Sequence, residues 1–259
     1  MDRAELLTLM DLNWCEMTRA IARTTPGGWI VERCGLVMCG TPLGTMVTNM
    51  TMVAGRVDAR TLREESDHVF RERSIPFSLW TRAHADGELE RALPATGFSE
   101  VWKTPAMTLD PAAAARLTSA HGRADVRVVE DDTDRAAYAD VMADAYAIYG
   151  APHEATRAHF AMLASVAGPT TQAFLAWHDG RPVAGAALYV SHGVGGIGWV
   201  GTLPAYARCG YAAAVTGAAV RAGGALGVRF FNLQASPMGV RLYERMGFTT
   251  PTYYRVFVS

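Results

Sequence analysis

A run of small residues with one arginine precedes a predicted helix, and its composition suits the binding of an anion. The run extends from Tyr206 to Ala212 and contains Arg208 and Gly210. Small residues let a ligand approach the start of a helix closely, and the first backbone N–H groups there have no partner within the helix. With the helix dipole and the arginine, these groups suit a pyrophosphate. An ordinary loop-to-helix turn packed with small side chains is the competing interpretation.

A second segment near the C-terminus favours the anion site. It follows a predicted strand and carries a serine, a small residue, Leu-Tyr and Gly-Phe in that order. In order and spacing it resembles the closing motif of the GNAT N-acetyltransferase superfamily. The upstream loop resembles that superfamily's acyl-CoA pyrophosphate loop, Arg/Gln-x-x-Gly-x-Gly/Ala, except that Ala207 stands where arginine or glutamine is usual. The matching residues are Gly210 and Ala212 in the loop and Ser236, Gly239, Leu242, Tyr243, Gly247 and Phe248 in the closing motif.

The resemblance implies an acetyl-CoA-dependent N-acetyltransferase between about Arg127 and Ser259. Members of the superfamily hold the pantetheine arm between two splayed strands, where it pairs with backbone like an added strand. They place a tyrosine, here Tyr243, as the general acid that protonates the departing thiolate, and a phenol with a pKa of about 10 keeps its proton at neutral pH. A core aromatic is the alternative role for this tyrosine. The residues implied to bind acetyl-CoA are Val200, Thr202, Arg208, Cys209, Gly210, Tyr211, Ala212, Ala213 and Ser236.

The sequence defines the acceptor side of the reaction less well. The resemblance implies direct attack by a primary amine, of a small molecule or a peptide, in a ternary complex. The strand before the pyrophosphate loop, Ile197–Val200, contains no acid or histidine that could act as general base. His153, Glu154 and His159 are candidates for that role, and a bound water or an amine that arrives neutral are equal alternatives. The residues expected to line the acceptor pocket are Tyr146, Tyr149, His153 and Glu154, each with a plain surface or packing role as its alternative.

The apolar pattern of the second half predicts a mixed sheet with helices on both faces. Asp179-Gly180 between two apolar runs indicates a β-hairpin. Gly193–Gly198 fits the text G-x-G-x-x-G, but a strand rather than a helix follows it, so we interpret it as a flexible hairpin turn. The predicted elements are strand Val126–Val129, a helix to Tyr149, helix Glu154–Val166, strands Gln172–His178, Pro182–Ser191 and Ile197–Gly201, helix Tyr211–Ala222, strand Arg229–Ala235, helix Met238–Met246 and strand Tyr253–Val258.

The first half repeats this plan in outline. Arg91–Phe98 aligns with Arg241–Phe248, and in that alignment Leu93 replaces Tyr243, although a chance match is the alternative. The predicted fold class is α/β (α+β, mixed sheet) and GNAT-like, with two tandem domains of which the C-terminal one is functional. The predicted domains are a degenerate copy over 1–110, a linker or short helix over 111–125 and the acyl-CoA-binding domain over 126–259. The elements expected in the first half are helix Arg3–Arg23, strands Trp29–Glu32, Leu36–Cys39 and Met46–Val53, helix Asp58–Phe70, strand Phe77–Thr81, helix Glu88–Leu93 and strand Val101–Leu109.

Composition limits the partners that we expect. The chain has 259 residues and a net charge of -1, which gives no electrostatic case for nucleic acid or an anionic membrane. Its four cysteines form no CxxC pair and no zinc-ligand spacing, so we expect reduced thiols and no metal. No apolar run approaches about 18 residues and no signal peptide is visible, so we expect a cytoplasmic protein. A non-catalytic acyl-CoA-binding sensor or scaffold is the alternative to an enzyme, and the sequence leaves the oligomeric state open.

Overall fold

The computed structural model describes residues 1–42, 48–117, 124–150, 152–165, 168 and 170–259. The chain folds into two compact units. The first contains Met1–Ala106, Gln234–Pro237 and Thr250–Ser259, and the second contains Met107–Leu233 and Met238–Thr249. The C-terminal segment of the chain therefore belongs to the N-terminal unit.

The N-terminal unit is a mixed sheet with the strand order β1-β2-β3-β4-β11-β5. Strands β1 to β3 are antiparallel, whereas β3 and β4 are parallel and are joined through helix α2. Strand β11 pairs with β4 in antiparallel fashion. The elements are α1 (Arg3–Thr24), β1 (Trp29–Arg33), β2 (Leu36–Gly40), β3 (Met50–Val53), α2 (Ala59–Arg71), β4 (Ser78–Arg82), α3 (Gly87–Ala92), the 3-10 helix η1 (Leu93–Thr96), β5 (Ser99–Leu109) and β11 (Thr249–Val258).

The two long helices of this unit cover opposite faces of its sheet. Leu36 and Met38 pack in one buried cluster with residues of α2, including Leu62. Val37 and Cys39 pack in another cluster with residues of α1. Because successive side chains of a strand point to opposite faces, β2 separates the two helices. The unit therefore has three layers, helix, sheet and helix.

The C-terminal unit repeats this order of elements. Its strands follow the order β10-β9-β8-β7-β6, with β10 parallel to β9 and the other pairs antiparallel. The predicted α/β class is confirmed in both units. The elements are α4 (Pro111–Leu117), β6 (Asp125–Val128), α5 (Asp132–Tyr146), the 3-10 helix η2 (Ala147–Tyr149), α6 (His153–Ser165), β7 (Thr171–His178), β8 (Arg181–Ser191), β9 (Val194–Thr202), the 3-10 helix η3 (Pro204–Tyr206), α7 (Tyr211–Ala225), β10 (Phe230–Gln234) and α8 (Val240–Arg245).

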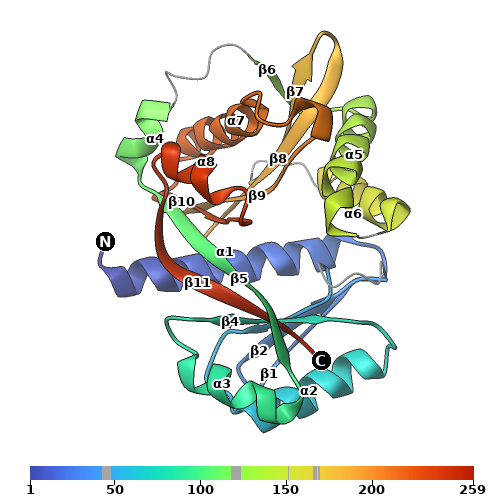
Figure 1. Cartoon of the computed structure of the whole chain (residues 1–259), viewed down its shortest axis with the longest axis vertical. Helices are drawn as coiled ribbons and strands as arrows, with labels where there is room; N and C mark the ends of the chain where they lie inside the picture. Colours follow the sequence, from blue (N-terminus) through green and yellow to red (C-terminus); the bar gives the residue numbers. More distant parts are fainter. Residues whose placement is uncertain (43–47, 118–123, 151, 166–167, 169) are drawn as a thin grey trace. The chain divides into compact units, whose positions relative to one another are not determined.

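Helices α5 and α7 lie on opposite faces of this second sheet (Figure 1). Ala184 and Ala186 of β8 pack in a buried cluster with Val215 of α7. The intervening Gly185 faces α5, since a Cβ built on it would lie 2.9 Å from the sulfur of Met142. Glycine at this position therefore lets α5 approach the strand closely.

The two units also end in the same local structure. The N–H of Phe98 donates to the carbonyl of Leu93 at 3.3 Å, and the N–H of Phe248 donates to the carbonyl of Tyr243 at 2.9 Å. The preceding glycine of each unit has a left-handed φ, 86° in the first and 92° in the second. Leu93 and Tyr243, which the sequence alignment pairs, thus occupy equivalent positions in the local structure of the two units.

The structure changes several predicted boundaries. The interpretation of Gly193–Gly198 as a flexible turn is wrong, because β9 begins at Val194 and the turn lies at His192 and Gly193. The glycines within β9 make room for neighbouring side chains, as at Gly195, where a Cβ would lie 2.7 Å from Phe231. The predicted helix Met238–Met246 spans only Val240–Arg245, and the last strand begins at Thr249. Residues 46 and 47 of the predicted strand Met46–Val53, residues 118–123 of the segment 111–125 and Val166 lie outside the described residues.

Helix α7 offers a matched test of this packing at two adjacent glycines. A Cβ at Gly223 would lie 2.5 Å from the ring of Phe231, whereas a Cβ at Gly224 would meet nothing within 4 Å. We expect Gly223→Ala to lower the free energy of unfolding by about 1–3 kcal/mol, because the buried ring must move. Gly224→Ala should leave it unchanged or raise it by up to about 1 kcal/mol through helix propensity. Urea unfolding measures both, and equal effects would contradict the packing of α7 on β10.

Candidate active site

Two parallel strands separate in the C-terminal unit. Strand β9 pairs with β10 over Val194–Gly196 and Phe230–Asn232. Within the described residues the pairing of these strands goes no further, although β9 continues to Thr202 and β10 to Gln234. The backbone of β9 past Gly196 therefore has an edge, on the side of β10, that a ligand with amide groups could pair with.

A β-bulge bends β9 in the same stretch. Gly185 and Ala187 of β8 are two residues apart, but their partners on β9, Gly201 and Gly198, are three apart. The bulged strand contains Trp199 with a φ of 54°, a conformation that is rare for residues other than glycine. Bulges bend a strand away from its neighbour, and strained residues of this kind cluster at functional sites.

Helix α7 begins directly after the loop that leaves β9. Its N-cap is Gly210, which has a φ of 91° and makes no side-chain capping bond. A Cβ at Gly210 would meet nothing within 4 Å, so the space beside this N-cap residue is open. Such an end presents backbone N–H groups and the positive end of the dipole to an anion. Of the residues expected to bind acetyl-CoA, Arg208, Cys209 and Gly210 are exposed, Val200, Thr202, Tyr211, Ala212 and Ser236 are half-buried, and Ala213 is buried.

Tyr243 lies on α8 and is largely buried, with 7% of its surface exposed. Its ring contacts Phe248 at 5.7 Å between centroids. Burial, with a smaller effect of Tyr149, raises the pKa of the Tyr243 phenol. The hydroxyl therefore stays protonated at neutral pH, as a proton donor must.

Five rings of this unit form what we call the aromatic cluster: Tyr146, Tyr149, His159, Phe160 and Trp199. Tyr146 is at its centre, with centroid distances of 5.3 Å to Tyr149, 5.2 Å to Phe160 and 6.0 Å to Trp199. Tyr146 and Tyr149 also interact electrostatically with Tyr243, so the cluster lies close to the phenol. The sequence pointed to both tyrosines but missed Trp199, whose one signal is a large aromatic residue in a glycine-rich strand.

The two other residues expected on the acceptor side lie elsewhere. His153 and Glu154 are exposed on the first turn of α6. His153 is 3.0 Å from Asp144 of α5 and forms an ion pair with it when protonated. These two residues keep their alternative role as surface residues.

His159, by contrast, is buried on the inner side of α6. Only 5% of its surface is exposed, and neither ring nitrogen has a hydrogen-bond partner among the described residues. Burial lowers the pKa of the imidazole to about 4, so the ring is neutral at physiological pH. A neutral imidazole carries one N–H donor and one acceptor nitrogen.

The N-terminal unit has a carboxylate at the helix start where the C-terminal unit has Gly210. Its helix α2 follows β3 as α7 follows β9. Asp58 caps α2, and its carboxylate accepts from the Thr61 N–H at 2.9 Å and from the Thr61 hydroxyl at 2.7 Å. An anion would have to compete with this side chain.

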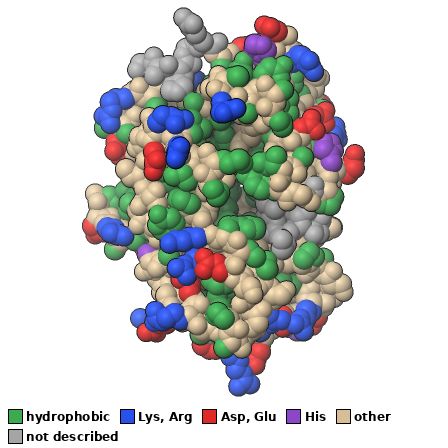
Figure 2. Space-filling view, viewed as in Figure 1, with side chains coloured by type: hydrophobic (Ala, Val, Ile, Leu, Met, Phe, Trp, Pro, Cys, Tyr) green, Lys and Arg blue, Asp and Glu red, His purple; other side chains and the backbone are tan. Residues whose placement is uncertain are grey.

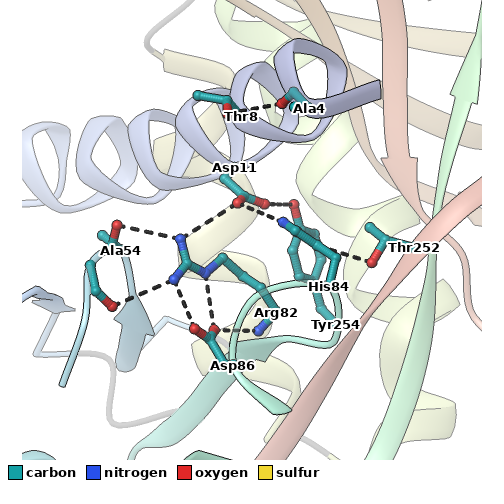
Figure 3. A network of polar contacts seen from close by, with 10 residues as sticks. Ala4, Thr8, Asp11, Ala54, Arg82, His84, Asp86, Thr252 and Tyr254 are labelled. Atoms are coloured by element: carbon teal, nitrogen blue, oxygen red, sulfur yellow. Dashed lines mark hydrogen bonds and ion pairs between the residues drawn. The ribbon is translucent and has the colours of Figure 1, made fainter. Parts of the chain in front are cut away.

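A charged network also occupies the end of β3 and β4 in this unit (Figure 3). The Arg82 guanidinium donates to the Asp86 carboxylate at 2.8 Å and to the carbonyls of Ala54 and Gly55 at 3.4 and 3.5 Å. It also lies 3.6 Å from Asp11 of α1. The backbone just after β3 thus has a partner from its own unit.

The described surface, possible metal ligands and helices add no further candidate sites. Figure 2 shows acidic and basic side chains interspersed over the face drawn, without a block of one sign. In the described part of the chain, no group of three or more His, Cys, Asp or Glu side chains could hold a metal ion. None of the described helices combines the length and apolar character needed to span a bilayer.

Comparison with known proteins relates part of this chain to a known family. Residues 135–248 match the family model described as "Acetyltransferase (GNAT) family". None of the curated proteins matches the chain. The matched segment, which begins in α5 and ends just after α8, is therefore similar to GNAT acetyltransferases.

Solved structures extend the likeness to nearly the whole chain. A GCN5-related N-acetyltransferase from Kribbella flavida is 19% identical with a TM-score of 0.75, covering 96% of this chain and 95% of that one. A GCN5-related N-acetyltransferase from Sphaerobacter thermophilus is 16% identical with a TM-score of 0.61, covering 87% and 80%. A tandem GNAT protein from the clavulanic acid biosynthesis pathway is 14% identical with a TM-score of 0.59, covering 91% and 84%. At these identities the likeness shows the fold, and the predicted GNAT-like fold class is confirmed.

Burial of His159 predicts a pH-dependent stability. Its pKa falls from 6.5 to about 4 in the folded protein. Between these values the unfolded chain binds a proton at His159 that the folded protein does not bind. The contribution of His159 to the free energy of unfolding is therefore fully present above about pH 6.5 and is lost as the pH falls. The loss should be on the order of 2 kcal/mol at pH 5.

Urea unfolding at pH 7 and pH 5 measures this loss. From pH 7 to pH 5, the free energy of unfolding should fall for both proteins. The fall should be about 2 kcal/mol smaller for His159→Phe than for the wild type. Comparing the two pH values cancels any constant cost of the substitution. The exposed His68→Phe should behave as the wild type, and an identical fall in His159→Phe would contradict the burial of this histidine.

Proposed function

We propose that the C-terminal unit is an acetyl-CoA-dependent N-acetyltransferase that transfers the acetyl group to a primary amine by direct attack. One observation carries the proposal: the separation of β9 from β10 leads directly into a helix start that no side chain caps. The open strand edge could pair with the amides of the pantetheine arm of coenzyme A. The helix start at its end could bind the pyrophosphate.

The residues proposed to hold acetyl-CoA come from both sides of this separation. Backbone near Val200 and Thr202 would pair with the pantetheine amides. The first N–H groups of α7, from Gly210 onwards, would bind the pyrophosphate, with Arg208 as a neighbouring charge. This stretch departs from the usual family pattern at Ala207, and the open space beside Gly210 supports the fit.

Tyr243 is proposed as the general acid. The amine nitrogen forms a bond to the acetyl carbon, the carbon–sulfur bond breaks, and Tyr243 gives its proton to the sulfur. The proton that the amine loses passes to water, and water returns a proton to Tyr243, so that the net products are an amide and a free thiol. Because burial disfavours a tyrosinate, the phenol would recover its proton promptly.

A non-catalytic acyl-CoA-binding sensor or scaffold is the second candidate. Two observations favour it, the small Ala207 in the pyrophosphate loop and the absence of an acid or histidine in β9. Such a protein would bind acetyl-CoA without turning it over, and Tyr243 would then serve as a packing residue.

We further propose that the N-terminal unit is a degenerate GNAT-like copy that binds no acyl-CoA. Three features support this proposal. Asp58 caps the helix that would receive the pyrophosphate, Arg82 bonds to the backbone after β3, and Leu93 stands at the position of Tyr243. In this account residues 1–110 supply the copy and residues 126–259 the functional domain, although Gln234–Pro237 and Thr250–Ser259 pack in the N-terminal unit.

Replacing Tyr243 by Phe separates the enzyme from the binding protein. The change removes the hydroxyl and keeps the ring on Phe248, so we expect kcat to fall about 10²–10⁴-fold with little change in the affinity for acetyl-CoA. Thiol release across a panel of amines measures kcat, and calorimetric titration measures binding. Tyr253→Phe, at an exposed tyrosine, is the matched control and should keep wild-type turnover. Unchanged turnover in Tyr243→Phe would remove this residue from the mechanism.

A further inference from the structure

The aromatic cluster holds polar atoms that the fold does not use. His159 is 95% buried, yet neither of its nitrogens hydrogen-bonds to a described residue. The indole N–H of Trp199 is also buried without a partner in the described chain. Most buried polar groups are satisfied in native proteins, so two such side chains in contact call for an explanation.

The two side chains are in contact, next to the stretch where β9 has left β10. Their rings meet at 4.9 Å and 66°, so one bound group could reach nitrogens of both. Trp199 occupies the bulge of β9, at the stretch where β9 has left β10. Tyr146 links the pair to the general acid, since it contacts Trp199 and interacts with Tyr243.

The character of the cluster is aromatic rather than acidic. Tyr149 is 55% exposed, whereas Tyr146 and Trp199 are half-buried as whole residues. The nearby acids Asp140 and Asp144 of α5 form ion pairs with Arg157 and His153. Burial is the cause of the lowered pKa of His159. Flat apolar groups are the natural partners of such rings.

We propose that the acceptor is an arylalkylamine, which packs its ring against Tyr146, Tyr149 and Trp199 and donates a hydrogen bond from its amino group to His159. The inference rests on the proposed acetyltransferase function and adds the substrate class. Polyamines and aminoglycosides, which carry several charges, are disfavoured because the cluster offers no acidic side chain to pair with them.

His159 in this account binds the amine and orients it. The neutral ring accepts a hydrogen bond from an N–H of the amine in its neutral form, and its low pKa makes it a poor acceptor of a whole proton. The nitrogen lone pair of the amine is then left to attack the acetyl carbon. Trp199 has its N–H available for a hydroxyl or other acceptor on the same substrate.

The test uses the full-length protein, saturating acetyl-CoA and four probe amines. 2-Phenylethylamine and tryptamine represent the proposed class, and spermidine and glycylalanine represent polyamines and peptides. We expect the wild type to release thiol with the two arylalkylamines at a lower KM than with the other probes. His159→Phe should raise the KM for the arylalkylamines about tenfold, the loss expected for one hydrogen bond, with the KM for acetyl-CoA unchanged. Trp199→Phe, which keeps an aromatic ring, should raise the KM for the arylalkylamines less than His159→Phe does.

Two controls make the outcome decisive. His68→Phe, on the surface of the other unit, should match the wild type, and acetyl-CoA binding by each variant shows that it is folded. Thiol release with spermidine or the dipeptide but with neither arylalkylamine would overturn this inference and leave the acetyltransferase standing. An unchanged KM for arylalkylamines in both His159→Phe and Trp199→Phe would also overturn it. Acetyl-CoA binding with no thiol release for any amine would instead overturn the proposed function, and this inference with it.

Discussion

The separation of β9 from β10 after three paired residues is the constraint on which the C-terminal unit depends. Parallel neighbours normally share hydrogen bonds along their length, and backbone groups left without partners are costly. Here the bulge at Trp199 bends β9, while Gly185 and Gly201 let α5 pack closely on this part of the sheet. The stability of the unit is thus supplied by the packing around the gap, and the strand edge is left available to a ligand.

The two units have the same order of elements but differ in whether the strand edge and the helix start are available to a ligand. Each has a β-strand, a helix and a parallel strand in the same order, followed by a short helix and a left-handed glycine. In the N-terminal unit, the groups that a ligand would use are satisfied by Asp58 and Arg82. In the C-terminal unit the corresponding helix start has Gly210, which brings no side chain. The difference lies in a few polar side chains rather than in the fold.

The sequence predicted those parts of the fold and site that local chemistry determines. The loop at Gly210, the helix that follows it and the position of Tyr243 all follow from short motifs, and so did the alignment of Leu93 with Tyr243. The glycine-rich start of β9 was misread because glycine favours turns, whereas Gly195 serves to admit the ring of Phe231. The burial of His159 and its contact with Trp199 join residues forty positions apart, which periodicity alone does not reveal.

The most direct test of the central claim is a calorimetric titration of the purified protein with acetyl-CoA. The account places one acyl-CoA site in the C-terminal unit and none in the N-terminal unit, so it predicts micromolar binding with one molecule of acetyl-CoA per chain. Two molecules per chain would contradict the assignment of the N-terminal unit as a degenerate copy. No binding at millimolar acetyl-CoA would contradict the central claim itself, because the gap between β9 and β10 would then have a purpose other than holding coenzyme A.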